Sequence, residues 1–91
     1  MARTVLVTGS SRGLGATIVK TLAEQGFQVV INYNNSKEAA ERIASEIGEK
    51  AIAIQADVTQ REDVERLVKE ATDHFGQIDV VVNNACLLYT S

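Results

Sequence analysis

Proline and tryptophan are absent from this 91-residue sequence, and cysteine and histidine occur once each. A single cysteine allows no internal disulfide and no metal site built from several cysteines. Without proline, no helix or strand is interrupted by a residue that lacks a backbone donor. These absences exclude a disulfide-stapled scaffold and a cysteine-rich metal module, and the composition is that of an ordinary globular domain.

Long apolar runs and basic clusters are lacking as well. The opening segment MARTVLVTG holds one charge and a strand-length apolar run that ends at Gly9, too short for a signal sequence or a membrane span. Lys and Arg number 9 against 12 Asp and Glu, and they are scattered along the chain. We therefore expect a cytoplasmic protein with no nucleic acid partner and no membrane partner.

Short β-branched runs alternate with longer segments of helical period. The runs predict strands at residues 4–8, 28–32, 51–55 and 80–83, and each is nearly continuous in apolar character. Strands of that kind belong to parallel sheets covered on both faces. The alternation predicts an α/β fold in which a Rossmann-like, doubly wound parallel sheet is truncated to four strands, in the order 3-2-1-4, with three helices.

The first predicted helix places Leu14, Ile18 and Leu22 four residues apart on one stripe, and Gly26 is its stop signal. Right-handed crossovers place the first two helices on one face of the sheet and the third on the other.

Polar residues mark the starts of the other two helices. Ser36 is placed to cap the second helix, which Gly48 ends. Thr59 and Glu62 form the pattern of a capping box for the third helix, which Gly76 closes.

The stretch TGSSRGLG, residues 8–15, lies between the first strand and the first helix. Gly9 allows a sharp turn off the strand, Gly13 allows backbone to approach a pyrophosphate, and Gly15 allows close packing of helix and strand. The free N–H groups and the positive dipole end of the helix then face the phosphates. A glycine-rich turn without a ligand is the alternative, but the position at the opening of a βαβ series favours a phosphate site.

Three motifs in order, TGSSRGLG, DVT at residues 57–59 and NNA at residues 83–85, resemble the short-chain dehydrogenase/reductase family. Within it, the chain looks most like the 3-oxoacyl-acyl-carrier-protein reductases. The resemblance covers residues 1–85 and identifies them as the N-terminal half of an NAD(P)-binding Rossmann domain. It implies a parent homotetramer that transfers hydride from NADPH to a small-molecule or acyl-carrier-bound carbonyl, while a tyrosine supplies the proton.

The resemblance also implies a cofactor-binding set that spans the ends of the four strands. The residues of the glycine motif line the phosphates and the adenosine ribose, and Tyr33 flanks the 2′-phosphate. Asp57 and Val58 touch the adenine, and residues 83–85 pass beneath the ribose. Read from the residues alone, Asp57 remains open as a turn or helix-entry aspartate, and Asn83 and Asn84 remain open as turn formers. The full set is Gly9, Ser10, Ser11, Arg12, Gly13, Leu14, Gly15, Asn32, Tyr33, Asn34, Asp57, Val58, Asn83, Asn84 and Ala85.

The cofactor preference is predicted from charge. NAD-selective sites carry an acid at the end of the second strand, about 20 residues beyond the glycines, to hold the ribose 2′-OH. Here that strand runs into NYNNSK with no acid before Glu38. Arg12 is able to pair with a 2′-phosphate, although it could instead be a solvated loop arginine. We expect NADP(H), with NAD(H) as the alternative.

Three residues of types that often serve in catalysis, Tyr33, Lys37 and His74, are not assigned a catalytic role. Tyr33 and Lys37 have the Y-x-x-x-K spacing of the family's catalytic pair, in which lysine lowers the tyrosine pKa. In the family that pair follows the fifth strand, whereas Tyr33 follows the second, so we expect it to flank the 2′-phosphate. His74 is expected on the solvent side of the third helix, near its C-terminus. We assign no catalytic residue and no metal ligand.

The last six residues, 86–91, depart from the family. The family motif continues NNAG, whereas this chain has Cys86 and then LLYTS. CLLYTS is one reading frame of TGTCTCTTATACACATCT, a transposase end sequence attached to DNA fragments in sequencing libraries. We therefore expect a non-native tail and an inactive fragment whose catalytic residues lie downstream. The alternatives are a small NADP(H)-binding module without catalysis, or a family member acting on a sugar or steroid alcohol.

Overall fold

The computed structural model describes residues 2–84 and contains one sheet and three helices. All four strands are parallel, in the order β3-β2-β1-β4, so the predicted fold class and strand order are confirmed. The elements in chain order are β1 (Thr4–Val7), α1 (Gly13–Glu24), β2 (Gln28–Tyr33), α2 (Lys37–Ile47), β3 (Ala51–Gln55), α3 (Arg61–Phe75) and β4 (Val80–Val82).

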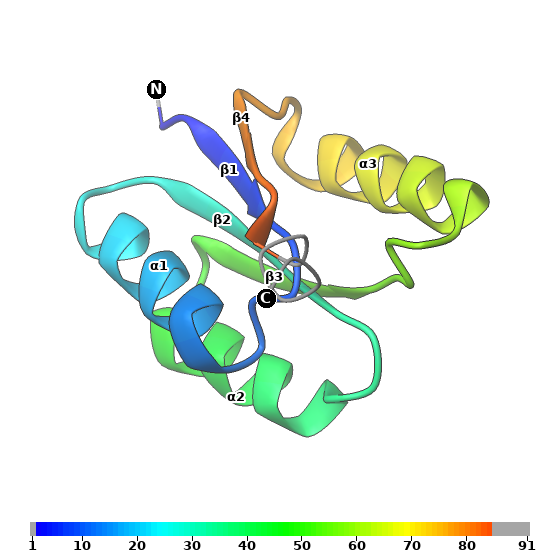
Figure 1. Ribbon diagram of the computed structural model, residues 1–91. Helices are drawn as coiled ribbons and strands as arrows, with labels where there is room; N and C mark the ends of the chain where they lie inside the picture. Colours follow the sequence, from blue (N-terminus) through cyan, green and yellow to red (C-terminus); the bar gives the residue numbers. More distant parts are fainter. Residues whose placement is uncertain (1, 85–91) are drawn as a thin grey trace.

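The sheet is covered on both faces, α1 and α2 lying on one and α3 on the other (Figure 1). On the first face, Val7 and Ile31 of the sheet pack in one cluster with Val19 of α1. On the second, Val30 packs in a separate cluster with Leu67 of α3. Neighbouring residues of one strand thus face opposite helices, which is why the strands read as continuous apolar runs.

Strand β4 is the most exposed strand of the sheet. Among the described residues it pairs with β1 alone, and Val80 and Val81 are 44% and 56% exposed. Apolar side chains on an outer strand favour association with other chains.

The apolar stripe of α1 differs from the predicted one. Leu14 is 63% exposed, whereas Ile18 and Leu22 pack against the core as expected. The fully buried positions of α1 are Gly15 and Val19. Leu14 lies in the first turn and is not among the residues that pack against either core cluster, so helical spacing alone does not bury it.

The predicted capping box is wrong. The N-cap of α3 is Gln60, one residue later than predicted, and no side chain caps it. The Thr59 hydroxyl donates instead to Oδ1 of Asp57 at 2.6 Å. Asp63 accepts from the backbone N–H of Asp57 at 2.8 Å, so the helix fixes the preceding loop rather than its own end.

The other predicted helix ends fall where the sequence indicated. Ser36 occupies the N-cap position of α2, although its side chain makes no capping hydrogen bond. Gly76 ends α3 in the left-handed conformation with φ of 89°. No helix within residues 2–84 is long and apolar enough to cross a membrane.

Candidate functional site

A cavity of about 490 Å³ opens at the carboxyl ends of the strands. The chain first continues from β1 to β2 and β3 on one side of β1, and later returns to place β4 on the other side. The strand order therefore reverses next to β1. Ligands of open α/β sheets bind at such a switch point. The cavity is lined by Gly9, Ser11, Arg12, Gly13, Leu14, Asn32, Tyr33, Asn34, Asn35, Ser36, Ala56, Asp57, Val58 and Asn84.

The loop between β1 and α1 is shaped by its glycines. Gly9 and Gly13 have φ of 58° and 62°, in the left-handed region where a side chain is strained. Gly15 has no room for a side chain, because a Cβ there would lie 2.6 Å from Nδ2 of Asn84 and 2.7 Å from Cα of Ser10. The turn and packing roles predicted for Gly9 and Gly15 are confirmed.

The N-terminus of α1 faces the cavity without a cap. Arg12 is the N-cap residue, its side chain makes no capping hydrogen bond, and the first turn contains no acid. The N–H groups at the start of a helix have no intrahelical partner and attract anions. With Gly13 and Leu14 lining the same cavity, this end of α1 is chemically suited to a phosphate group.

Two asparagines hold the loop from opposite sides. Oδ1 of Asn32 accepts from the N–H of Gly9 at 3.0 Å, and Nδ2 of Asn84 donates to its carbonyl oxygen at 3.0 Å. Beside Asn84, the Thr8 hydroxyl donates to Oδ1 of Asn83 at 3.2 Å. Asn83 and Asn84 therefore tie the end of β4 to the loop that follows β1.

Asp57 follows β3 at the rim of the cavity. The Thr59 hydroxyl donates to its Oδ1, as does the Thr59 N–H at 3.0 Å. These two hydrogen bonds, the hydroxyl first, lower the pKa of the Asp57 carboxyl below its ordinary value. Asp57 is thus held in the turn through its Oδ1 atom, and it also lines the cavity, where it is placed to contact a ligand.

Replacing Thr59 should raise the pKa of Asp57. A carboxyl whose pKa is lowered by folding contributes stability above its unfolded pKa, and that contribution is lost as the pH falls through the folded pKa. In Thr59→Val the hydroxyl is missing, so Asp57 should titrate closer to its ordinary value, and the stability that this carboxyl contributes above its unfolded pKa should be smaller than in the wild type. Carbon-13 titration of the Asp57 carboxyl measures this, and an unchanged pKa would contradict it. Thr72→Val is the control, because it makes the same substitution within α3 and outside this turn.

The structure brings most of the predicted cofactor residues to one cavity. Three of the described residues do not line it: Ser10 is buried, Gly15 packs closely against Asn84 and the backbone of Ser10, and Asn83 is exposed and accepts from the Thr8 hydroxyl. Ala85 and residues 86–91 lie outside the described residues. The sequence analysis missed Asn35, Ser36 and Ala56, although their positions directly after the second and third strands were the available signal.

The two residues of the Y-x-x-x-K pair differ in burial. Tyr33 is 8% exposed and belongs to the core cluster under α1 and α2, while Lys37 is exposed at the start of α2. His74 is exposed and stacks edge-on against Phe75, with 4.6 Å between ring centroids. Within residues 2–84, no group of three or more His, Cys, Asp or Glu is placed to hold a metal ion.

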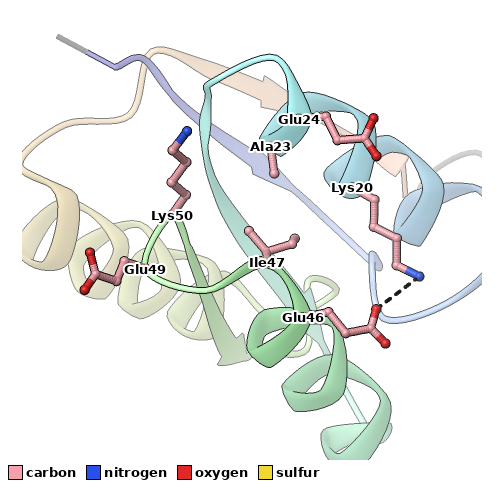
Figure 2. Close-up of a pocket in the computed structure, with 7 residues that line it drawn as sticks. All are labelled: Lys20, Ala23, Glu24, Glu46, Ile47, Glu49 and Lys50. Carbon is pink, nitrogen blue, oxygen red and sulfur yellow. Dashed lines mark ion pairs between the residues drawn. The ribbon is translucent and has the colours of Figure 1, made fainter.

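A second cavity, of about 550 Å³, lies at the opposite ends of α1 and α2 (Figure 2). Lys20 and Glu46 form an exposed ion pair across it at 3.6 Å, and Ala23 and Ile47 supply its apolar wall. Helix C-termini present carbonyl oxygens, which disfavour anions. Although slightly larger, this cavity lacks the glycine loop and the free N–H groups of the first.

The parallel sheet, its crossovers and the glycine loop at the switch point define a Rossmann-like α/β protein. The sequence model of the family described as short chain dehydrogenase matches residues 3–91, and the chain belongs to this family.

Relatives and solved structures agree with this assignment. The chain is 47% identical over 88 residues to 3-oxoacyl-(acyl-carrier-protein) reductase FabG of Staphylococcus aureus, covering 93% of this chain and 36% of the relative. A 3-ketoacyl-(acyl-carrier-protein) reductase from Brucella melitensis, complexed with NADH, superposes with a TM-score of 0.82 at 38% identity, covering 87% of this chain and 32% of that one. A Burkholderia cenocepacia protein described as a dehydrogenase, with bound NADP, has a TM-score of 0.83 at 35% identity, covering 90% and 33%. The chain spans about a third of the length of the relatives it matches.

Proposed function

We propose that this chain is the cofactor-binding part of an NADPH-dependent oxidoreductase that reduces a 3-oxoacyl thioester, or a similar carbonyl, to the alcohol. The observation that carries the proposal is the uncapped N-terminus of α1, which opens with the glycine loop onto a cavity at the switch point. A dinucleotide fits this donor set, because its pyrophosphate needs backbone N–H groups and close backbone approach. When bound, the nicotinamide supplies the hydride.

Residues of this chain would bind and orient the cofactor. The N–H groups around Arg12 to Leu14 would hold the pyrophosphate, and Asp57 and Val58 would flank the adenine. Asn83 to Ala85 would lie beneath the ribose, as the resemblance implies. We assign no proton-transferring group to residues 2–84, since Tyr33 belongs to the core cluster and Lys37 does not line the cavity. Catalytic groups downstream of residue 85, a non-native tail at residues 86–91, a cytoplasmic location and a homotetrameric parent are parts of the same proposal.

The preference for NADP(H) rests on a second helix N-terminus at the same cavity. No side chain caps α2, and Asn34, Asn35 and Ser36 line the cavity in front of it. The acid in its first turn, Glu38, is exposed and does not line the cavity. Arg12 lines the same cavity, so an anion near the end of β2 would have a guanidinium and N–H donors nearby but no carboxylate of that segment. These features support binding of a 2′-phosphate.

Placing an acid after β2 should reverse this preference. Asn34 is exposed, follows β2 directly, and accepts only a weak bond from Gln55 at 3.3 Å. Asn34→Asp should weaken NADPH binding about tenfold by repulsion of the 2′-phosphate, while NADH binding is kept or improved. The neutral Asn34→Ala is the matched control and should keep the NADPH preference. Equal loss for both cofactors would contradict the proposed phosphate position.

The reaction is tested on the complete reading frame. The locus should be amplified from source DNA without transposase fragmentation, sequenced past the codon for Ala85, and expressed. We expect oxidation of NADPH with a 3-oxoacyl thioester, faster than with NADH. Binding of NADPH without turnover of any carbonyl would favour the non-catalytic module, and turnover of a sugar or steroid alcohol would reassign the substrate class.

A further inference from the structure

Asn32 is a polar residue in the buried part of β2, next to Val29, Val30 and Ile31. It is 2% exposed, yet its side chain has partners on both sides. Oδ1 accepts from the N–H of Gly9 at 3.0 Å, and Nδ2 donates to the carbonyl oxygens of Ala56 at 3.2 Å and Ile54 at 3.4 Å. The carboxamide therefore connects the glycine loop after β1 to the end of β3, across β2.

Ser10 completes the connection from the loop. Its hydroxyl donates to the carbonyl oxygen of Val7 at 2.7 Å and accepts from the N–H of Asn32 at 3.1 Å. Its own N–H donates to the carbonyl oxygen of Asn32 at 2.9 Å. Gly9 and Ser10 are thus both hydrogen-bonded to Asn32, and Ser10 does not line the cavity. Neither side chain leaves a buried polar atom unpaired within the described residues.

The orientation of the Asn32 amide is fixed by its partners. If it were flipped, its oxygen would face two carbonyl oxygens and its NH₂ group would face the N–H of Gly9. Only one orientation satisfies both sides, so the carboxamide acts as a spacer that sets where the loop leaves β1. The N–H groups that follow, from Ser11 to Leu14, are then held toward the cavity before any ligand arrives.

We propose that Asn32, with Ser10, is a positioning residue that holds the glycine loop in its phosphate-binding shape. This inference rests on the proposed function, because it assumes that the loop binds the cofactor phosphates. It assigns Ser10, which does not line the cavity, to action through the loop and not to contact with the cofactor, and it gives Asn32, which does line the cavity, a positioning role through Gly9. If the loop leaves this shape for part of the time, the apparent cofactor affinity falls by the fraction of molecules that remain competent.

Two variants and one control test the inference in the full reading frame. Ser10→Ala removes the hydroxyl bridge, and Asn32→Asp keeps an acceptor for Gly9 but loses the donor toward Ala56. The control, Thr4→Val, removes another buried side-chain bond, from Thr4 to Gln28 at 3.0 Å, at the opposite end of β1. We expect the dissociation constant of NADPH to rise about tenfold in Ser10→Ala and further in Asn32→Asp, but to stay unchanged in Thr4→Val.

A pH profile separates positioning from general destabilisation. The carboxyl introduced by Asn32→Asp can donate to a carbonyl oxygen when protonated, so its NADPH affinity should recover as the pH falls. The charged or titratable side chains of the same cavity are Arg12, Tyr33 and Asp57, and the wild type shares all three. The difference between the two profiles therefore reports the introduced carboxyl. Unchanged affinity in both variants, each with a cooperative unfolding transition, would overturn the inference.

Hydrogen exchange of the Gly9 amide keeps the inference separate from the proposed function. Without cofactor, this amide should exchange faster in Ser10→Ala than in the wild type or in Thr4→Val. A wild type that binds neither NADPH nor NADH would contradict the proposed function, whereas equal Gly9 protection in all three proteins would contradict the positioning role. Should Asn32→Asp fail to fold, the Ser10→Ala result decides.

Discussion

Gly15→Ala should lower the free energy of unfolding by about 1–3 kcal/mol and weaken cofactor binding, although alanine is the better helix former. The added Cβ would lie 2.7 Å from Cα of Ser10 and 2.8 Å from the carbonyl oxygen of Gly9. Both are backbone atoms of the phosphate-binding loop, so relief requires the helix and loop to separate. Urea unfolding and NADPH titration measure the two effects.

The direction of this effect is diagnostic. Without a collision, replacing a helical glycine by alanine stabilises a protein by roughly 0.5–1 kcal/mol. A more stable Gly15→Ala protein with unchanged NADPH affinity would therefore contradict the close packing. Gly13→Ala is the matched control, since its Cβ would meet nothing within 4 Å and only its φ of 62° is unfavourable.

Leu67→Ala should cost about 2–5 kcal/mol of unfolding free energy. Leu67 is 1% exposed and is the largest buried side chain of α3, packed in one cluster with Leu6, Val30 and Ile54 of the sheet. Ala71 is the only other buried residue of that helix, and Phe75 packs partly buried against the same cluster, so Leu67 is the main buried anchor of α3. Because whole domains are stable by about 5–15 kcal/mol, the loss is a large fraction of the total.

The neighbouring residue provides the comparison for this variant. Val68 is 41% exposed, and Val68→Ala should change stability by no more than about 0.5 kcal/mol. Chemical denaturation gives both values, and hydrogen exchange shows whether the α3 amides lose protection first. Equal effects of the two substitutions would mean that α3 is not anchored through Leu67.

The arrangement of the elements was predictable because it follows from chain-wide patterns. Continuous apolar strands that alternate with amphipathic segments admit few topologies once crossovers are right-handed. The strand order, the helix faces and the grouping of TGSSRGLG, Asp57 and Asn84 at one edge follow from that. The glycine roles were readable too, since Gly9 and Gly15 have tasks that only glycine performs.

Local hydrogen bonding was harder to predict, because several partners compete for each polar group. Thr59 had the spacing of a capping box, but Asp57 two residues earlier was the closer acceptor for its hydroxyl. Leu14 had helical spacing, but periodicity does not reveal which turns of a helix lie over the core. Asn32 carried a usable signal: a polar residue in a buried strand requires partners, although their identity depends on the neighbouring strands.

The central claim is that the cavity at the carboxyl edge of the sheet binds a nicotinamide dinucleotide. Amide chemical-shift mapping with NADPH tests it most directly, because this cavity and the cavity of Lys20 and Glu46 have separate reporters. We predict saturable shifts at Gly9 to Leu14, Asn34 to Ser36 and Val58, with NADH binding more weakly. No shifts there, or shifts confined to the cavity of Lys20 and Glu46, would contradict the account.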